Sequence, residues 1–444
     1  LATLYFGVLK PEDRLAVKPH AAPVFHAIQY LMGRQSRQKL IDFRAFGGAQ
    51  SYPSRTKDTE DVDFSTGSVG LGVAFTAFAS MVQDYVRAKD WSGKERPEGR
   101  MIALAGDAEL DEGNIYECLL EGWKHGLRNC WWIIDYNRQS LDGVVREGLY
   151  DRIEAIFKAF GWKVVTLKYG ALQRTAFAEP GGEKLKAWID ACPNDLYSAL
   201  MFRGGAAWRE RLNDEIGDQG EVSALLSRRS DEELATLMAN LGGHCVESLL
   251  DQFESADNEQ PTVFINYTVK GWGTPLAGHK DNHAGQMTSA QIEQLRATHK
   301  IRDGYEWELF EGLEQADALA DFVRNVPFNT AASRRLTAPA VPTIGPQFIG
   351  TGATSTQAAF GRILDAIART DSEMARRIVS TSPDVTVSTG LGSWVNRRNL
   401  FARKETADLF QKEAIPSTQK WRFTPDGQHM ELGIAEMNLF LMLG

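Results

Sequence analysis

Short apolar runs alternate with amphipathic stretches along residues 15–160. The runs at 101–106 (MIALAG) and 130–137 (CWWIIDYN) predict buried strands, and apolar residues recur at helical spacing between them, from Ile115 to Leu127. A strand, a helix and a second strand in succession form a βαβ unit, which implies a parallel sheet. Further strands are expected within 161–167 (GWKVVTL) and 261–271 (PTVFINYTVKG). The pattern therefore predicts an α/β fold.

The periodicity is lost near residues 325–354, which are rich in Pro, Ala, Thr and Gly and predict an interdomain linker. Helical spacing resumes at 355–370, and a second βα pattern begins near 376–384. We therefore expect three parts, with the bounds 1–326 for the first domain, 327–353 for the linker and 354–444 for a second domain. Because 1–9 reads as a core helix without a leader and 437–444 stops inside an apolar run, we expect part of a longer polypeptide with an incomplete second domain.

Composition narrows the class of protein. Among the 444 residues, 43% are hydrophobic and 24% charged, which is typical of a globular protein, and no run is long and apolar enough to cross a bilayer. The net charge of −9 argues against nucleic acid or an acidic membrane as a partner. The four cysteines are Cys118, Cys130, Cys192 and Cys245, and they lie far apart in the sequence without metal-ligand spacing. We therefore expect reduced thiols in a cytoplasmic protein.

An acidic turn, GDAELDEGN, follows the predicted strand at 101–106 and carries four carboxylates. Ligands of parallel sheets bind beyond the carboxyl ends of the strands, and both Asp107 and Asn137 lie at such ends, 30 residues apart. With Gln139, these residues offer hard oxygen ligands that suit Mg²⁺ or Ca²⁺, and the next helix offers its amino-terminus to phosphates. Asp107 alone would more often be a helix cap. Its spacing from DYNRQSLDG favours a cation site.

The spacing of Gly-Asp-x and a later Asn resembles the metal motif of thiamine-diphosphate enzymes. Longer stretches resemble the homodimeric, bacterial-type decarboxylating component of pyruvate dehydrogenase complexes, and the resemblance covers nearly the whole chain. They are AQSYPSR, TGSVGLG, GDAELDE, NRQSLDG, GGAAWRE, SDEELATLMANLGGH and YTVKGWG. Transketolases share the metal motif and TGSVGLG, but GGAAWRE and LMANLGGH are not expected in them. The resemblance implies two thiamine-diphosphate-binding-type parallel-sheet domains, with thiamine diphosphate and Mg²⁺ as cofactors.

The resemblance also implies roles for residues of the first domain. Asp107, Asn137 and Gln139 are expected to bind Mg²⁺. The remaining cofactor contacts are expected from Ser68 and Val69 in the Gly-rich turn, Ala108, Glu109, and Lys270, which would reach toward the diphosphate. Two positions depart from the family pattern: Ala108 stands where Gly is usual, and Asp135 stands where Asn is more usual. The second departure leaves the hydrogen bonding around Asp135 open.

The stretch QHMELGIAEMN resembles the segment that carries the essential glutamate of the family, which falls on Glu436. Thiamine chemistry begins with proton loss from the thiazolium carbon. A carboxylate that is hydrogen-bonded to the aminopyrimidine ring favours the imino tautomer, whose nitrogen accepts that proton. Glu431 is the rival assignment. Ile434 would be the bulky residue that keeps the cofactor bent.

Histidines complete the expected site. His20, in KPHAAPVFHA, matches an active-site histidine of the family. His283, in GHKDNHAGQ, matches a histidine on a mobile loop that assists reductive acetyl transfer, although His279 is close enough to be the alternative.

The function implied by the resemblance is oxidative decarboxylation of a small 2-oxo acid, such as pyruvate or 2-oxobutyrate, with acyl transfer to a lipoyl group on an acyltransferase partner. An obligate homodimer is implied, because the diphosphate-binding domain of one subunit meets the pyrimidine-binding domain of its twin. Transketolase-type ketol transfer between sugar phosphates is the alternative reaction. A catalytically idle paralogue acting as a scaffold is a third reading, against which Asp107, Asn137 and Glu436 together argue.

Overall fold

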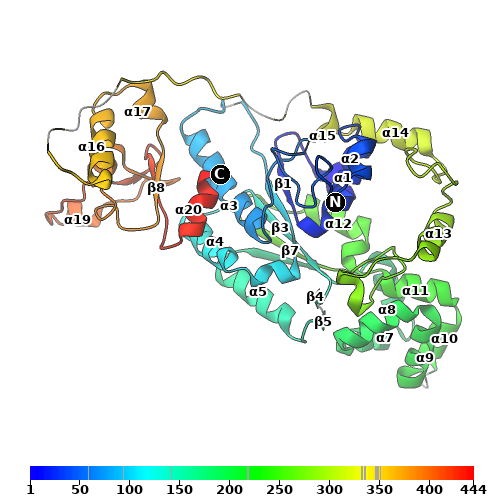
Figure 1. The fold of residues 1–444 in the computed structure, drawn as a ribbon. Coiled ribbons are helices and arrows are strands. Elements are labelled where there is room, and N and C mark those ends of the chain that lie inside the picture. The colour runs from blue at the N-terminus through cyan, green and yellow to red at the C-terminus, as the bar shows by residue number, and fades with distance from the viewer. Residues whose placement is uncertain are drawn as a thin grey trace.

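The computed structural model describes residues 1–444 except 59, 94, 142, 218–219, 332–333, 335–336, 346–349 and 351. A five-stranded sheet with the order β1-β2-β3-β7-β6 lies at its centre, and every neighbouring pair in it is parallel (Figure 1). The strands are β1 (Arg14–Val17), β2 (Met101–Gly106), β3 (Cys130–Tyr136), β6 (Lys163–Leu167) and β7 (Thr262–Tyr267). The four strands expected from the sequence are confirmed, and β1 is an additional one.

Two hydrophobic cores cover the two faces of this sheet, which explains the nearly continuous apolar runs of β2, β3 and β7. One face packs against α3 (Leu71–Ala88), α4 (Gly113–Lys124) and α5 (Leu149–Ala159). The other packs against the π-helical segment Leu4–Val8, α1 (Ala22–Leu31) and α12 (Val246–Glu254). A buried parallel sheet leaves its carboxyl edge as the place where loops meet a ligand.

A helical insertion separates β6 from β7 and has a core of its own around the fully buried Trp208. Figure 1 shows it below and to the right of the sheet. Its helices before α12 are α6 (Ala171–Phe177), α7 (Gly182–Ala191), α8 (Asn194–Arg203), α9 (Gly205–Ile216), α10 (Glu221–Ser227) and α11 (Asp231–Ala239). GGAAWRE and SDEELATLMANLGGH belong to this insertion.

The second sheet is also parallel, with the order β10-β9-β11-β8. Its strands are β8 (Ser380–Ser382), β9 (Leu400–Phe401), β10 (Phe423–Thr424) and β11 (His429–Glu431), and α16 (Thr356–Ala368) and α18 (Gly392–Arg398) form its core. The chain then enters α20 (Glu436–Leu443), which packs on α3 and α4. The expected fold class, α/β with two parallel-sheet domains, is thereby confirmed.

The predicted linker begins with α15 (Pro327–Thr330), whose Phe328 is buried, and part of it lies outside the described residues. The domain bounds therefore stay a prediction. Among the described residues, no helix has the length and apolar character needed to span a membrane. The remaining elements are α2 (Arg37–Ile41), α13 (Ser289–Thr298), α14 (Ala316–Asn325), α17 (Glu373–Arg377), α19 (Leu409–Lys412), and the antiparallel pair β4 (Gln139–Ser140) and β5 (Gly143–Val144).

Candidate functional site

The acidic turn and the Asn-containing segment lie side by side at the carboxyl edge of the central sheet. Asp107 follows β2, and Asn137 follows the neighbouring strand β3. The backbone N–H groups of Ala108 and Arg138 each donate to one oxygen of Asp107, both at 2.9 Å. The backbone N–H of Gln139 donates to Asn137 Oδ1 at 3.0 Å. These backbone bonds hold both side chains in place before any cation arrives.

The charges at this edge do not balance. Burial raises the pKa of Asp107 to about 6 and also raises the pKa of Glu109. Partial burial opposes the charge of Asp135, whose side chain is 27% exposed, but the charge of Lys18 and the hydrogen bonds from Lys18 and Thr268 hold its pKa below the ordinary value. When all three carboxylates are ionised, the single ammonium leaves two negative charges uncompensated. One divalent cation would balance them.

The donor set fits such a cation. Asp107 contributes a carboxylate and Asn137 an amide oxygen, and each of these oxygens has a lone pair left after its backbone bond. Gln139 is buried and donates through Nε2 to the carbonyl of Gly278 at 3.2 Å, whereas its Oε1 has no hydrogen-bond partner among the described residues. Hard oxygens of this kind suit Mg²⁺.

A narrow cleft adjoins the turn and is lined by Lys18, Ser68, Gly70 and Glu109, among others. Glu109 accepts a hydrogen bond from the backbone N–H of Gly106 at 2.8 Å, so its carboxylate is turned back onto the strand end. Gly70 has φ +83°, and a Cβ there would lie 2.8 Å from the side chain of Glu112. Only glycine fits at this N-cap position, and α3 can therefore begin at Leu71, close behind Ser68 and the partly buried Val69, with its amino-terminus at the cleft.

Three basic side chains converge beside the cleft. The rings of His20 and His283 lie 5.2 Å apart between centroids, and Lys270 Nζ donates to His283 Nδ1 at 3.1 Å. Partial burial and the charge of Lys18 lower the pKa of His20, so this ring is neutral at neutral pH. His279 instead packs its ring on Phe202 at 4.6 Å. The structure thus brings His283, and not His279, to His20.

The glutamate motif of the second domain lies on the surface of this chain. Glu436 is exposed, its side chain makes no hydrogen bond or ion pair within the described part of the chain, and Ile434 is 84% exposed. The backbone before α20 is fixed to α4, because Gly433 N donates to Glu121 Oε1 at 2.9 Å and His125 Nε2 donates to the carbonyl of Glu431 at 3.0 Å. Glu431 and Glu436 are therefore firmly placed, although neither is enclosed.

Some site residues lie within the quoted motifs but were given no role from the sequence. Lys18 forms an ion pair with Asp135, and Thr268 donates to the same carboxylate. Arg138 is buried with its guanidinium 4.6 Å from the ring centre of Tyr197, which ties the metal-site loop to the helical insertion. The one signal for Lys18 was the unusual aspartate at 135, because a buried carboxylate needs a cationic partner.

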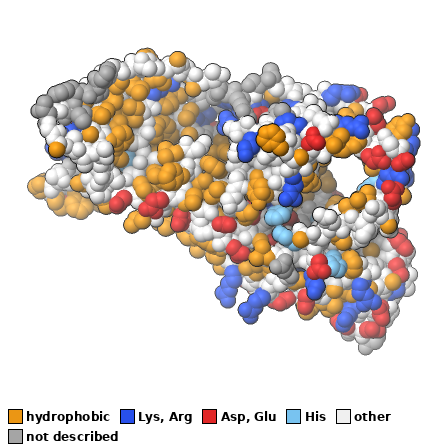
Figure 2. Space-filling model, viewed as in Figure 1, with side chains coloured by type: hydrophobic (Ala, Val, Ile, Leu, Met, Phe, Trp, Pro, Cys, Tyr) orange, Lys and Arg blue, Asp and Glu red, His pale blue; other side chains and the backbone are white. Residues whose placement is uncertain are grey.

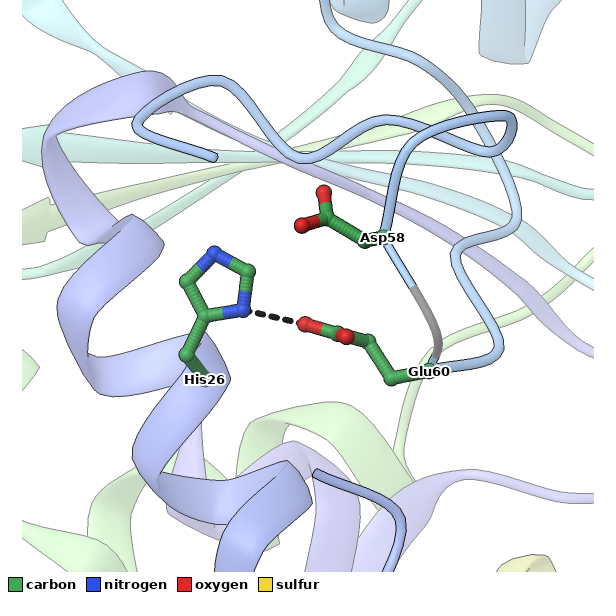
Figure 3. A group of neighbouring side chains, drawn as sticks. All are labelled: His26, Asp58 and Glu60. Atoms are coloured by element: carbon green, nitrogen blue, oxygen red, sulfur yellow. Dashed lines mark hydrogen bonds and ion pairs between the residues drawn. The ribbon is translucent and has the colours of Figure 1, made fainter. Parts of the chain in front are cut away.

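A second group of ionisable side chains, His26, Asp58 and Glu60, lies apart from these residues (Figure 3). His26 Nδ1 is bonded to Glu60 Oε1, and Nε2 to the carbonyl of Gln50 at 2.7 Å. The carbonyl can only accept, so Nε2 donates to it, and the carboxyl beside Nδ1 favours the charged form of the ring. A metal ligand needs a free nitrogen lone pair. The group is therefore a buried ion pair and not a metal centre.

Known proteins that resemble this chain include thiamine-diphosphate-binding relatives. Residues 12–177 match the family described as transketolase, thiamine diphosphate binding domain. The chain is 26% identical over 452 residues to the pyruvate dehydrogenase E1 component of Pseudomonas aeruginosa, covering 96% of this chain and 49% of that protein. It is 29% identical over 313 residues to the same component of Haemophilus influenzae, covering 69% and 34%. The chain spans about half the length of the curated relatives it matches.

Solved transketolases share the fold. The chain superimposes on transketolase from Leishmania mexicana with a TM-score of 0.59 at 16% identity, covering 100% of this chain and 57% of that one. Transketolase from Campylobacter jejuni gives 0.59 at 16% identity, with 99% and 57% covered. The resemblance indicated by the sequence motifs is thereby confirmed.

Proposed function

We propose that the full-length protein is a thiamine-diphosphate- and Mg²⁺-dependent enzyme that decarboxylates a small 2-oxo acid, pyruvate or a close relative. The acyl group would pass to a lipoyl group on an acyltransferase partner. The observation that carries the proposal is the placement of Asp107 and Asn137 on neighbouring strand ends, within a region that matches a thiamine diphosphate binding domain. Similarity to pyruvate dehydrogenase E1 components along 96% of the chain supports the 2-oxo acid branch.

The roles of the residues follow from their chemistry. Asp107, Asn137 and Gln139 would hold Mg²⁺, and the turn at Ser68 and Val69 with Lys270 would hold the diphosphate beside it. When bound, thiamine diphosphate would supply a thiazolium carbon that becomes nucleophilic toward the carbonyl of a 2-oxo acid once its proton is removed. His20 would accept a proton in its neutral form, while His283 receives a hydrogen bond from Lys270 at Nδ1 and so carries its own proton on Nε2.

Glu436 and Ile434 would act on the cofactor held by a second subunit, since both face outward from this one. An exposed apolar surface surrounds them, here called the α4–α20 patch: Tyr116, Leu120, Trp123, Ile434, Met437, Phe440 and Leu443. Figure 2 shows hydrophobic side chains extending from the lobe on the left across the centre of the molecule. Contiguous apolar surface of this kind marks an interface, so we infer a homodimer.

The experiment is an activity assay of the full-length protein with Mg²⁺ and thiamine diphosphate. We expect ferricyanide reduction with pyruvate or 2-oxobutyrate, and no ketol transfer from xylulose 5-phosphate. Asp107→Ala should remove Mg²⁺-dependent cofactor binding, measured by calorimetry, whereas the exposed Asp111→Ala in the same turn should leave it unchanged. Ketol transfer without 2-oxo acid turnover would establish the transketolase reaction, and cofactor binding without either activity would favour an idle paralogue.

A cytoplasmic location completes the proposal. All four cysteines are free, and three of them are buried. Reduced thiols of this kind are typical of a reducing compartment. Fractionation of cells that express the full-length protein tests it, and recovery with the membrane or periplasmic fraction would contradict it.

A further inference from the structure

The side chain of Lys18 extends across the carboxyl ends of the strands that carry the proposed metal site. Lys18 directly follows β1, and its backbone N–H donates to the carbonyl of Leu104 on β2 at 3.0 Å. Its side chain then extends across the end of β2, where a Cβ placed on Gly106 would lie 3.7 Å from Lys18 Nζ. The ammonium meets the Asp135 carboxylate on β3, and the lysine side chain is only 11% exposed.

Asp135 contacts both Lys18 and Asn137. One of its carboxylate oxygens binds Lys18 and the other accepts from Thr268 Oγ1, just beyond β7. The backbone carbonyl of Asp135 accepts from Asn137 Nδ2 at 3.4 Å. The pair therefore joins the ends of three strands and is two residues from a proposed metal ligand.

A buried ion pair of this kind depends on both partners. Removing one charge leaves the other desolvated and uncompensated, whereas removing both leaves a neutral pair that still forms hydrogen bonds. Lys18 also stands among three carboxylates, Asp107, Glu109 and Asp135, so its loss would leave all three without a fixed cation. The cost of that loss should fall on the residues that hold Mg²⁺.

We propose that Lys18 and Asp135 form a matched positioning pair that sets the affinity of this site for magnesium thiamine diphosphate. The inference rests on the proposed function, since it assumes that this cofactor binds here. Neither residue is assigned to touch the cofactor. They act through the orientation of Asn137.

The test is a double-mutant cycle on the full-length protein. The dissociation constant of thiamine diphosphate is measured by calorimetry with saturating MgCl₂ for the wild type, Lys18→Gln, Asp135→Asn and the double variant. Partners that orient metal ligands typically contribute about 10–100-fold to affinity, so each single substitution should weaken binding by about that factor. The double variant should return to within about threefold of the wild type, because Gln and Asn keep the hydrogen bonds without charge.

A matched control separates positioning from general stability. Arg100 and Asp13 form an ion pair at the opposite, amino ends of β1 and β2; the arginine side chain is 11% exposed, as in Lys18, and Asp13 is more buried than Asp135, at 2% against 27%. Asp13→Asn should lower the melting temperature and leave cofactor affinity unchanged.

Three results would overturn the inference. Single variants that bind like the wild type, or a double variant as weak as the two losses combined, would show that the residues are not a matched pair. An affinity loss in Asp13→Asn equal to that in Lys18→Gln would show a merely structural role. If the wild type itself binds no cofactor, the proposed function fails with the inference, whereas the first three results leave that function standing.

Discussion

His26 is buried between Glu60 and the carbonyl of Gln50, and these contacts favour its charged form. Burial opposes the charge, but the hydrogen bonds to Glu60 and to the carbonyl of Gln50 raise the pKa of His26 above its ordinary value. A group whose pKa is raised by folding contributes stability that is present below the pKa of the unfolded chain, about 6.5 for histidine, and is lost as pH rises through the folded pKa. The pair should therefore hold the 50–60 loop most firmly in mildly acidic solution.

We predict that His26→Gln lowers the free energy of unfolding by about 1–3 kcal/mol at pH 6, because a charged, buried hydrogen bond is lost. The gap between the variant and the wild type should shrink as pH rises toward 9. Urea unfolding at several pH values measures it, with the exposed His299→Gln as a control that should show no gap. A gap that stays constant across the range would mean that the imidazolium is not the species present.

Glu436 is accessible at the start of α20, and its role depends on a cofactor that another subunit would present. Glu436→Gln keeps the size and the hydrogen bonding of the side chain but removes the proton that the carboxyl would share with the aminopyrimidine ring in the proposed role. We predict that exchange of the thiazolium hydrogen for deuterium slows by about 10²–10⁴ in the full-length enzyme, while cofactor affinity changes far less. Unchanged exchange in this variant would direct attention to Glu431.

At the scale of elements, the loop at 270–285 owes its shape to the helical insertion. Gly278 has φ +77°, and a Cβ there would lie 2.7 Å from the carbonyl oxygen of Ser198 on α8. The carbonyl of Gly278 accepts from Gln139, and its N–H donates to the carbonyl of Lys270 at 3.0 Å. One glycine thus joins the proposed metal site, the loop of His283 and the insertion.

We predict that Gly278→Ala displaces this loop and lowers kcat of the full-length enzyme by at least about tenfold, since small misplacements of catalytic groups are costly. Gly273→Ala is the matched control. Gly273 lies in the same loop with φ +80°, but a Cβ there has nothing within 4 Å. The Gly273→Ala variant has the same backbone strain, about 1–2 kcal/mol, but its Cβ meets no neighbouring atom. Equal losses of kcat in both variants would show that strain alone matters.

The elements with long apolar runs were predictable, and those without such runs were not. β2, β3 and β7 follow from hydrophobic segments that a parallel sheet buries on both faces, whereas the edge strand β6 follows from a shorter apolar run and is only partly buried. β1 has only four residues and begins with Arg14, so its pattern is too short to separate from a loop. The sequence motifs of the insertion were recognised but its architecture was not, because helices that pack mainly on one another give no sequence signal of where they attach.

The candidate site also contains some residues that could be predicted from the sequence and others that could not. Asp107 and Asn137 were predictable because strand ends at a known spacing must lie close together in a parallel sheet. Lys18 was not, since its partner is 117 residues away and a lysine after a short strand has no periodic signal. Choosing between His279 and His283 also required coordinates, because only the loop geometry determines which ring approaches His20.

At the scale of the whole molecule, the α4–α20 patch is the surface that most needs a partner. Trp123 is 62% exposed and Phe440 66% exposed, on helices that pack against each other. Large aromatic side chains near the centre of an interface carry much of its binding energy.

If the full-length protein forms the proposed dimer, Phe440→Glu should convert it to a monomer in sedimentation at micromolar concentration and weaken cofactor binding at least about tenfold. Phe410→Glu on α19 is the control. Phe410 lies outside the patch, and its side chain is 63% exposed, close to the value for Phe440. A Phe440→Glu variant that remains a dimer would place the subunit interface elsewhere.

The position of β7 also determines when the protein can fold during synthesis. β7 lies between β3 and β6 but is made after both of them and after the whole insertion. At ~5–20 residues per second, the ribosome needs on the order of ten seconds to pass from the end of β6 to β7. Throughout that interval the nascent sheet has an open slot bordered by two unpaired strand edges, which are templates for aggregation. The insertion, with its own core, can fold during the same interval and hold β7 near its slot as it emerges.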